Sequence, residues 1–552
     1  MQDVFTDSPK PARSFDVGLE FLSDTTVLAS LSKIQRGIEK EGLRVTASGG
    51  LAQTPHPPAL GSALCNSWIT TDFSESLLEF ITPAYENITT TLDYLGDAHT
   101  IVAGILQDEV IWTASMPCKL PKDNDIPLAR YGKSNIAIMK TAYRRGLGHR
   151  YGRAMQTVAG IHYNFSLPEE YWRLEYESLQ SGSDSRQTSS KNLSRGNLRR
   201  YIDERYFDLI RNFRRNYWLL IYLFGSAPCV DSSFLNGREH TLQRLGDRDF
   251  YLPHATSLRM GDLGYQSVVQ KSLFVCYNDL NNYIATLKGA IDTPYLPYEK
   301  IGTNLNGEYQ QLSQGILQIE NEFYSAVRPK RSTETGEKPL HALRERGIQY
   351  IEVRCMDINP FMQLGIDATT MRFLDAFLLY CAALPSPQCD ENEFTQIAEN
   401  QALVVNRGRD PTLALRQKDS TAPLQALATT MLEGIARVAD KLDLAAGCGD
   451  SQASKLDSHH CAVQRQQEKL ADNNLTPSAT LLRELKNSGQ SFTEFVYERS
   501  AGYMHEHRAR ALQESRRNEF MALAEQSLES QADIERADNM PFDAYLKQYY
   551  AS

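Results

Sequence analysis

The sequence predicts an α+β protein in which one face of an antiparallel β-sheet packs on helices. Three observations predict this fold. Residues 35–45, 157–167 and 348–354 alternate polar and apolar side chains with the period of two of a half-buried strand. Segments with helical spacing lie between these strands, and a long helical region follows them. Strands with one polar face are typical of antiparallel sheets, because strands of parallel sheets are buried on both faces.

Composition excludes several classes of protein. The chain has 552 residues and a formal net charge of -10, and its lysines and arginines form no dense run. We therefore expect no nucleic-acid partner. The nine cysteines include no Cys-x-x-Cys pair, which argues against a zinc–thiolate site and is typical of a reducing compartment.

The sequence also predicts a cytoplasmic protein that does not enter a membrane. Residues 1–15 are polar and lack the apolar core of a secretory signal. The longest strongly apolar run, Tyr217–Gly225, is less than half of the roughly 20 residues that a membrane helix needs.

The first predicted strand, residues 35–45, follows a helical segment at Val17–Leu31 and ends before a Gly49-Gly50 hairpin turn. Its period places Glu39 and Glu41 on one face, roughly 7 Å apart. Such a pair is most often the solvated face of an edge strand. Two carboxylates this close raise each other's pKa, so the alternative is that they hold a cation.

A second strand is predicted at Leu77–Ile81, with Glu79 between apolar neighbours and Asp72 in the preceding turn. A carboxylate embedded in apolar residues needs a partner, and a cation is one candidate. Thr89–Gln107 has helical spacing, and Gly132–Gly152 is predicted to be a Gly- and Arg-rich loop that covers a ligand. Its glycines match neither the P-loop nor the dinucleotide motif.

The third strand, residues 157–167, has His162, Asn164 and Ser166 on its polar face. A single histidine there is more often a structural residue than a ligand. Ser178–Gly196 is rich in Ser, Gln and Asn and is predicted to be a flexible insertion. Helices are predicted at Leu198–Leu223 and Asp279–Lys288.

Two further strands are predicted near the basic residues Arg328, Lys330 and Arg331, which are either solvated or in contact with phosphate. Gln318–Tyr324 is predicted to be a strand whose face carries Glu320 and Glu322. In the last strand, 348–354, Glu352 and Arg354 share one face.

The remaining chain is predicted to be mainly helical. Met371–Ala383 is strongly apolar, and charged helical segments follow the break at Pro385 and Pro387. Residues 446–475, which include His459 and His460, are weakly patterned and are predicted to be an exposed loop.

The polar strand faces would gather six residues on one surface of the sheet: Glu39, Glu41, Glu79, His162, Glu352 and Arg354. So many carboxylates converge only around divalent cations, because desolvated like charges protonate or separate. Oxygen ligands with one imidazole favour Mg²⁺ or Mn²⁺ over zinc. Without a P-loop, this surface suggests that metal ions deliver nucleotide phosphates.

Four motifs resemble those of proteobacterial glutamate-cysteine ligases, at residues 35–44, 69–75, 155–166 and 350–360. The similarity spans residues 34–384. It implies a glutamine synthetase-like antiparallel sheet that forms a funnel, with ATP and Mg²⁺ at one end. It also implies that the γ-carboxylate of L-glutamate attacks ATP and that the amine of L-cysteine displaces phosphate from γ-glutamyl phosphate. The product, γ-glutamylcysteine, begins glutathione synthesis.

The same resemblance implies roles for individual residues. Glu352 and Arg354 would be catalytic, with Arg354 neutralising charge on the transferred phosphoryl group. Arg259 and Tyr324 would bind the cysteine carboxylate. The metal ligands would be Glu39, Glu41, Asp72, Glu79, His162 and Glu352. The thiol pocket would be Phe73, Tyr143, Leu147, Gln156 and Tyr265, although ordinary core aromatics would give the same pattern. Separately from the resemblance, we expect ATP contacts from the basic residues Arg328, Lys330 and Arg331.

We accordingly expect a catalytic core at 1–384, interrupted by the insertion at 178–196, and a mainly helical region at 385–552 that packs on it. The protein is expected to be a monomer. Two alternatives remain open on the sequence alone. One is an ATP-dependent carboxylate-amine ligase of the same fold with another amine acceptor. The other is a non-catalytic protein that binds metal or glutamate.

Overall fold

The computed structural model describes residues 14–181, 195–264, 268–271, 273–334, 336–447 and 457–551. Most of the predicted insertion at 178–196, and Tyr265 of the predicted thiol pocket, lie outside the described residues.

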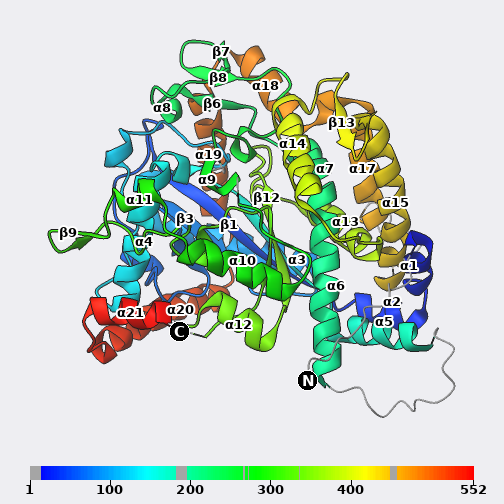
Figure 1. Ribbon diagram of the computed structural model, residues 1–552. Coiled ribbons are helices and arrows are strands. Elements are labelled where there is room, and N and C mark those ends of the chain that lie inside the picture. The colour runs from blue at the N-terminus through cyan, green and yellow to red at the C-terminus, as the bar shows by residue number, and fades with distance from the viewer. Residues whose placement is uncertain are drawn as a thin grey trace.

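A seven-stranded sheet lies at the centre of the described chain (Figure 1). Its strands run in the order β11-β12-β5-β1-β3-β2, with β4 paired to β1, and every pairing is antiparallel. The strands are β1 (Gln35–Thr46), β2 (Ile69–Thr71), β3 (Leu77–Ile81), β4 (Glu109–Ile111), β5 (Ile161–Ser166), β11 (Val327–Lys330) and β12 (Tyr350–Met356). The predicted antiparallel sheet is confirmed.

Helices pack on the apolar face of this sheet, as the sequence predicts. They are α3 (Ile88–Ile105), α6 (Arg195–Asn216), α7 (Trp218–Phe224) and α13 (Ala368–Ala383). The inward residues Ile38, Tyr163, Phe165, Ile351 and Val353 are fully buried in one hydrophobic cluster with them. The polar residues that alternate with these are left on the opposite face, where the candidate site forms.

The other helices before residue 385 surround this centre. They are α1 (Phe15–Phe21), α2 (Thr25–Leu31), α4 (Asn135–Tyr151), α5 (Glu169–Ser181), α8 (Ser232–Leu235), α9 (Val268–Lys271), α10 (Leu280–Asp292), α11 (Leu296–Glu299) and α12 (Pro339–Arg346). The short strands are β6 (Cys229–Asp231), β7 (Gln243–Leu245), β8 (Asp249–Tyr251), β9 (Asn304–Leu305) and β10 (Glu308–Tyr309).

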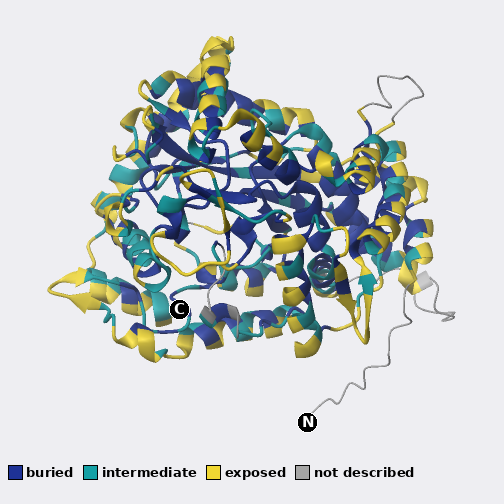
Figure 2. Cartoon of the chain, turned by 90° about the horizontal axis from the view of Figure 1, so that it is seen from above, coloured by how far each residue is buried: buried dark blue, intermediate teal, exposed yellow. Residues whose placement is uncertain are grey.

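The C-terminal region covers more than one side of the molecule. Figure 1 shows α15 and α17 beside α13 and α14 beside α7, whereas α20 lies beside α3 and α21, in red, beside α4. Its elements are α14 (Glu391–Arg407), β13 (Ala414–Gln417), β14 (Ser420–Pro423), α15 (Leu424–Ala445), α17 (His459–Ala471), α18 (Pro477–Ser488), α19 (Phe492–Ala509), α20 (Glu514–Ala537) and α21 (Phe542–Ala551). Buried residues concentrate at the centre of the folded molecule, and exposed residues lie on its outer helices and loops (Figure 2).

The predicted ligand-covering loop at Gly132–Gly152 is wrong, because most of it forms α4. Two of its glycines serve close packing within this helix. A Cβ on Gly146 would lie 2.2 Å from Gln318 Oε1, and one on Gly148 would lie 3.0 Å from the Arg153 side chain. Glycines in a segment therefore do not always indicate a turn. They can also lie within a helix where another side chain of the same protein approaches its backbone this closely.

The predicted strand at Gln318–Tyr324 is also wrong. It contains a 3-10 turn, Glu320–Glu322, in which the Glu322 carboxylate accepts a hydrogen bond from the Gln318 amide at 2.6 Å. Buried acidic residues at alternate positions mimic a polar strand face, but here each carboxylate binds backbone amides.

Three predicted segments have different boundaries or a different form. The N-terminal helical segment is divided into α1 and α2 by Asp24, which caps α2. The long helix predicted at Leu198–Leu223 is α6 and α7, with a break at Tyr217. The predicted exposed loop at 446–475 contains α17, and His459 at its start is 8% exposed.

Candidate active site

Strand register brings an acidic cluster together on the polar face of the sheet. Glu39 of β1 is paired with His162 of β5, and Glu41 of β1 with Glu79 of β3. Glu39, Glu79 and His162 each offer a ligand atom, and these atoms all lie within 4.8 Å of one another. Paired residues on adjacent strands are about 5 Å apart at Cβ, so the predicted strand faces meet without any loop contribution.

Hydrogen bonds fix two of the glutamates. Glu39 Oε2 lies 3.1 Å from His162 Nδ1, and Glu39 Oε1 accepts from Asn164 Nδ2 at 2.9 Å. Glu41 Oε2 accepts from the Gly160 amide at 2.6 Å. His162 Nε2 is buried 3.8 Å from Glu41 Oε1 and has no hydrogen-bond partner among the described residues.

The pKa values show how burial and neighbouring charge act on this cluster. Burial, together with Glu39, Asp72 and Glu41, raises the pKa of Glu79 well above its ordinary value. Burial also raises the pKa of Glu41. For Glu39, burial and Glu352 act in the same direction, but His162 and Lys330 outweigh them and the pKa is lowered. The cluster is therefore short of positive charge around Glu41 and Glu79.

Glu352 on β12 lies at the basic side of the cluster. Its Oε1 is 3.1 Å from Lys330 Nζ and 4.0 Å from His162 Nδ1, and its Oε2 accepts from Arg354 Nη1 at 2.9 Å. Burial opposes ionisation of Glu352, but Lys330 and Arg354 lower its pKa well below the ordinary value. Glu352 thus joins the acidic cluster to two cations, Lys330 of β11 and Arg354 of β12.

The donor set fits a hard divalent cation. An unpartnered buried imidazole nitrogen and carboxylates of raised pKa are the groups that a cation would satisfy. Carboxylate oxygens outnumber the single imidazole, which suits Mg²⁺ or Mn²⁺. Asp72, in the turn between β2 and β3, acts electrostatically on Glu41 and Glu79 and belongs to the same charged group.

A second group of predicted residues lies around α4. The Tyr324 hydroxyl accepts from Gln156 Nε2 at 2.7 Å. Leu147 of α4 and Phe73 are buried, and a Cβ on Gly148 would be 3.7 Å from the Phe73 ring. Tyr143 is half-buried on the same helix, four residues before Leu147. Tyr265 is outside the described residues.

Arg259 is fully buried next to the acidic cluster. Its Nη2 donates to the Arg354 carbonyl at 3.1 Å, and its Nη1 is 3.6 Å from Asp357 Oδ1. A Cβ on Gly160 would lie 1.9 Å from Arg259 Nη2, so only glycine fits beside the guanidinium. Gly160 thus contacts both Glu41 and Arg259, a role that the alternation of the strand does not indicate.

The basic residues 328–331 lie mostly on β11 and have different surroundings. Lys330 forms the ion pair with Glu352 described above. The Arg328 guanidinium donates to the backbone carbonyls of Asn321 and Phe323 at 2.9 and 2.5 Å. Arg331 is half-buried, and burial followed by the charge of Arg199 lowers its pKa.

Asn164 shares the polar strand face with His162, although the sequence predicts no role for it. In the structure its side chain donates a hydrogen bond to Glu39. Its place two residues after His162, on the same strand face, is the sequence feature that could have indicated this contact.

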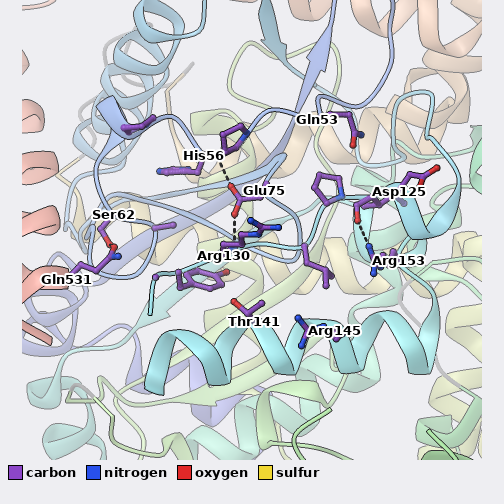
Figure 3. A pocket seen from close by; sticks show the side chains of 18 of the residues that line it. Gln53, His56, Ser62, Glu75, Asp125, Arg130, Thr141, Arg145, Arg153 and Gln531 are labelled. Atoms are coloured by element: carbon purple, nitrogen blue, oxygen red, sulfur yellow. Dashed lines mark hydrogen bonds between the residues drawn. The ribbon is translucent and has the colours of Figure 1, made fainter. Parts of the chain in front are cut away.

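A separate cavity of about 870 Å³ lies on the other side of α4 (Figure 3). Thr141, Arg145 and His149, spaced by four along the helix, line it, whereas Tyr143 and Leu147 do not. Glu75 accepts from the amides of His56 and Arg130, both at 2.6 Å, and Arg145 pairs with Glu308 at 2.8 Å. No residue predicted for the site is among the described residues that line this cavity.

An antiparallel sheet that gathers carboxylates, one histidine and arginines on one face is the kind of surface that an enzyme of the carboxylate-activating ligase class needs. The sequence matches the glutamate-cysteine ligase family over residues 19–404. It is 47% identical to the glutamate–cysteine ligase of Pseudomonas fluorescens over 535 residues, which cover 97% of this chain and 96% of that protein. The chain belongs to the glutamate-cysteine ligase family and is an enzyme of that family.

Solved structures agree with this assignment. A crystal structure of glutamate–cysteine ligase from Francisella tularensis in complex with AMP has a TM-score of 0.85 and 34% identity, covering 94% of this chain and 98% of that one. A bifunctional glutathione synthetase from Pasteurella multocida has the same fold over 89% of this chain and 55% of that one, with a TM-score of 0.65 and 23% identity. The predicted fold and family are confirmed. No helix in the described part of the chain is both long enough and apolar enough to cross a bilayer.

Proposed function

We propose that this chain joins the γ-carboxylate of L-glutamate to the amine of L-cysteine, with conversion of ATP to ADP and phosphate. Family membership supports the reaction. The observation that carries the assignment of its site is the convergence of Glu39, Glu79 and His162 from three adjacent strands. The product, γ-glutamylcysteine, is the precursor of glutathione.

The acidic cluster is proposed to hold Mg²⁺, with Mn²⁺ as a suitable substitute. The proposed ligands are Glu39, Glu41, Asp72, Glu79, His162 and Glu352. The unpartnered His162 Nε2 and the raised pKa values of Glu41 and Glu79 support this assignment. When bound, the metal supplies positive charge that neutralises phosphate oxygens.

In the first step a γ-carboxylate oxygen of glutamate attacks the γ-phosphorus of ATP. The bond from that phosphorus to the β–γ bridging oxygen breaks, and ADP leaves with the electron pair. Arg354 neutralises the developing charge on the phosphoryl oxygens, held in place by its hydrogen bond to Glu352. Arg328, Lys330 and Arg331 are proposed to contact ATP. Arg328 Nη2 already donates to two backbone carbonyls, so a contact of Arg328 with ATP would use its other guanidinium nitrogens.

In the second step the cysteine amine attacks the acyl carbon of γ-glutamyl phosphate. The C–O bond to phosphate breaks, phosphate leaves, and the amine loses a proton as the amide forms. Arg259 and Tyr324 are proposed to bind the cysteine carboxylate. The proposed thiol pocket is Phe73, Tyr143, Leu147, Gln156 and Tyr265. Its largely apolar members favour a thiol over a hydroxyl, which would lose hydrogen bonds on entry.

We also propose that residues 1–384 form the catalytic core, with 385–552 packed on it, and that the protein acts as a monomer in the cytoplasm. A hydrophobic cluster that contains both Leu378 and Leu432 supports close packing of the two regions.

The deciding experiment incubates purified protein with glutamate, ATP, Mg²⁺ and cysteine and identifies γ-glutamylcysteine by mass spectrometry. A parallel panel replaces cysteine with α-aminobutyrate, serine or ammonia and measures ADP release. Strong preference for another amine would identify a ligase of the same fold with a different acceptor. Mg²⁺ binding without any ADP release would identify a protein that only binds metal.

A further inference from the structure

Arg150 and Glu322 form a buried ion pair that has no part in the reaction described above. Arg150 Nη1 lies 2.9 Å from Glu322 Oε1, and both side chains are 0% exposed. Removing two charges from water is costly unless hydrogen bonds satisfy the remaining donors and acceptors. The partners of these two residues therefore indicate what the pair fixes.

Arg150, at the end of α4, holds the segment that follows α11 and β10. Its Nε and Nη2 donate to Gln311 Oε1 at 3.0 and 2.9 Å, and its Nη2 also donates to the Ser313 carbonyl at 2.8 Å. Its guanidinium stacks 4.1 Å from the centre of the Tyr298 ring. These contacts attach one end of α4 to residues 311–313.

Glu322 attaches the next part of the same segment to α4. Its Oε1 accepts from Arg150 and from the Tyr151 hydroxyl, the latter at 2.7 Å, and its Oε2 accepts from the Gln318 amide at 2.6 Å. Gln270 Nε2 donates to the Glu322 carbonyl at 2.9 Å and to the Tyr151 hydroxyl at 3.1 Å. Both carboxylate oxygens of Glu322 are thus used by fixed donors.

Two connections lead from this network to the proposed cysteine-binding residues. Gln270 Oε1 accepts from the Tyr324 backbone amide at 2.8 Å, which fixes the position of the backbone that carries the Tyr324 side chain. Gln318 is fully buried, and its Nε2 donates to the Tyr143 carbonyl at 3.2 Å. The Tyr550 hydroxyl of the C-terminal helix α21 donates to the Gln318 carbonyl at 2.8 Å. Tyr324 and Tyr143 are therefore placed relative to each other through Glu322 and Gln318.

We propose that Arg150 and Glu322 are positioning residues that fix the cysteine-binding wall and so determine the choice of amine acceptor. This inference rests on the proposed function for the identity of the acceptor. No contact joins the pair to Glu39, Glu79 or Glu352 among the interactions of the described residues, so phosphoryl transfer should not depend on it.

Glu322→Gln tests the proposal, because an amide has one acceptor oxygen where the carboxylate has two. The NH2 group of the new glutamine must face either the Arg150 guanidinium or the backbone N–H of Gln318. A donor therefore meets a donor in both orientations. We expect KM for cysteine to rise about tenfold or more, since small displacements of binding groups have large kinetic effects. We also expect weaker discrimination against serine and α-aminobutyrate, with KM for ATP within about twofold of wild type.

Glu175→Gln is a matched control. Glu175 is also a buried carboxylate, and it accepts from Arg205 Nε at 3.0 Å and from the Tyr201 hydroxyl at 2.9 Å on the distant helices α5 and α6. This variant should lose comparable thermal stability but keep the wild-type KM for cysteine. Tyr550→Phe is a milder variant that removes the hydroxyl that donates to the Gln318 carbonyl and should raise KM for cysteine about twofold.

Unchanged cysteine KM and acceptor preference in Glu322→Gln would overturn the proposal, as would an equal change in KM for ATP. If Glu322→Gln does not fold, a Tyr550→Phe variant with wild-type cysteine KM overturns it instead. Failure of the wild-type protein to form γ-glutamylcysteine would contradict the proposed function. An active wild type whose variants keep their selectivity contradicts only this inference.

Discussion

Glu79 is a carboxylate whose ionised form is disfavoured by its surroundings. Burial and three neighbouring acids raise its pKa, so ionisation of Glu79 works against the stability of the metal-free fold. Glu79→Gln should raise the melting temperature in EDTA by roughly 1–2 °C. It should also reduce the further rise caused by Mg²⁺, because a ligand is lost.

Differential scanning fluorimetry with and without Mg²⁺ measures both effects. Glu433→Gln, at an exposed position on α15, provides the control and should change neither value. A Glu79→Gln protein that responds to Mg²⁺ as wild type does would remove Glu79 from the ligand set.

Arg354 is the residue on which we expect phosphoryl transfer to depend most. In Arg354→Gln, loss of the positive charge should lower kcat by about 10³-fold or more, as for other arginine clamps. The buried Glu352 keeps Lys330 as a cationic partner at 3.1 Å, so the fold should survive. Steady-state kinetics and circular dichroism test this, and retention of more than a tenth of wild-type kcat would contradict the role.

At the level of elements, α17 is attached to the sheet through His459. Its Nδ1 lies 2.8 Å from Asp443 Oδ1 of α15, and its Nε2 lies 3.9 Å from Asp375 Oδ2 of α13. Asp375 in turn binds Arg36 at 2.6 Å and the Tyr163 hydroxyl at 2.7 Å. Burial alone would lower the pKa of His459, but Asp375 and Asp443 outweigh burial and raise it.

This raised pKa predicts a pH-dependent contribution to stability. The stabilisation is fully present below the pKa of an unfolded histidine, about 6.5, and is lost as pH rises through the higher folded pKa. The melting-temperature difference between wild type and His459→Gln should therefore be largest near pH 6 and shrink toward pH 9. His460→Gln, which removes the neighbouring half-exposed pair with Asp440, is the control. Parallel melting curves for wild type and His459→Gln would contradict this prediction.

The elements also show which features can be predicted from the sequence. The strands around Glu39, His162 and Glu352 are predictable because a period of two is local to each strand. The helix α4 and the turn at Glu320–Glu322 are not predictable, because each depends on contacts with the other. Gly146 of α4 packs against Gln318, and Glu322 binds Arg150 of α4. The prediction that His459 is exposed fails for the same reason, because Asp375 and Asp443 reach it only after folding.

For the whole molecule, the sheet explains why most of the candidate site is predictable. Once strands of known face pair in an antiparallel sheet, their polar residues must share a surface. Five residues given by the family resemblance fall on it, namely Glu39, Glu41, Glu79, His162 and Glu352. The alternation does not specify which strands are neighbours or what lies behind Gly160. The neighbours depend on strand order, and the group behind Gly160 is Arg259, which comes from a short 3-10 helix, Leu258–Met260.

The C-terminal region completes the core of the N-terminal half, and this makes a prediction about truncation. Phe520 of α20 is fully buried, with ring centres 4.7 Å from Trp68 and 5.1 Å from Tyr94. Phe492 packs 5.9 Å from Trp112. Removing these rings would expose large aromatic surfaces next to β2, α3 and β4, each worth several kcal/mol of burial.

A protein ending at residue 404, where the family match ends, should therefore be insoluble or lack a cooperative thermal transition. Co-expression of residues 405–552 as a separate chain should restore soluble protein, because side-chain packing, rather than the covalent link, holds the two regions together. Phe520→Ala in the full chain gives a graded test and should lower stability by about 3–5 kcal/mol in urea unfolding. A cooperative, soluble fragment 1–404 would show instead that the first 404 residues bury their own core.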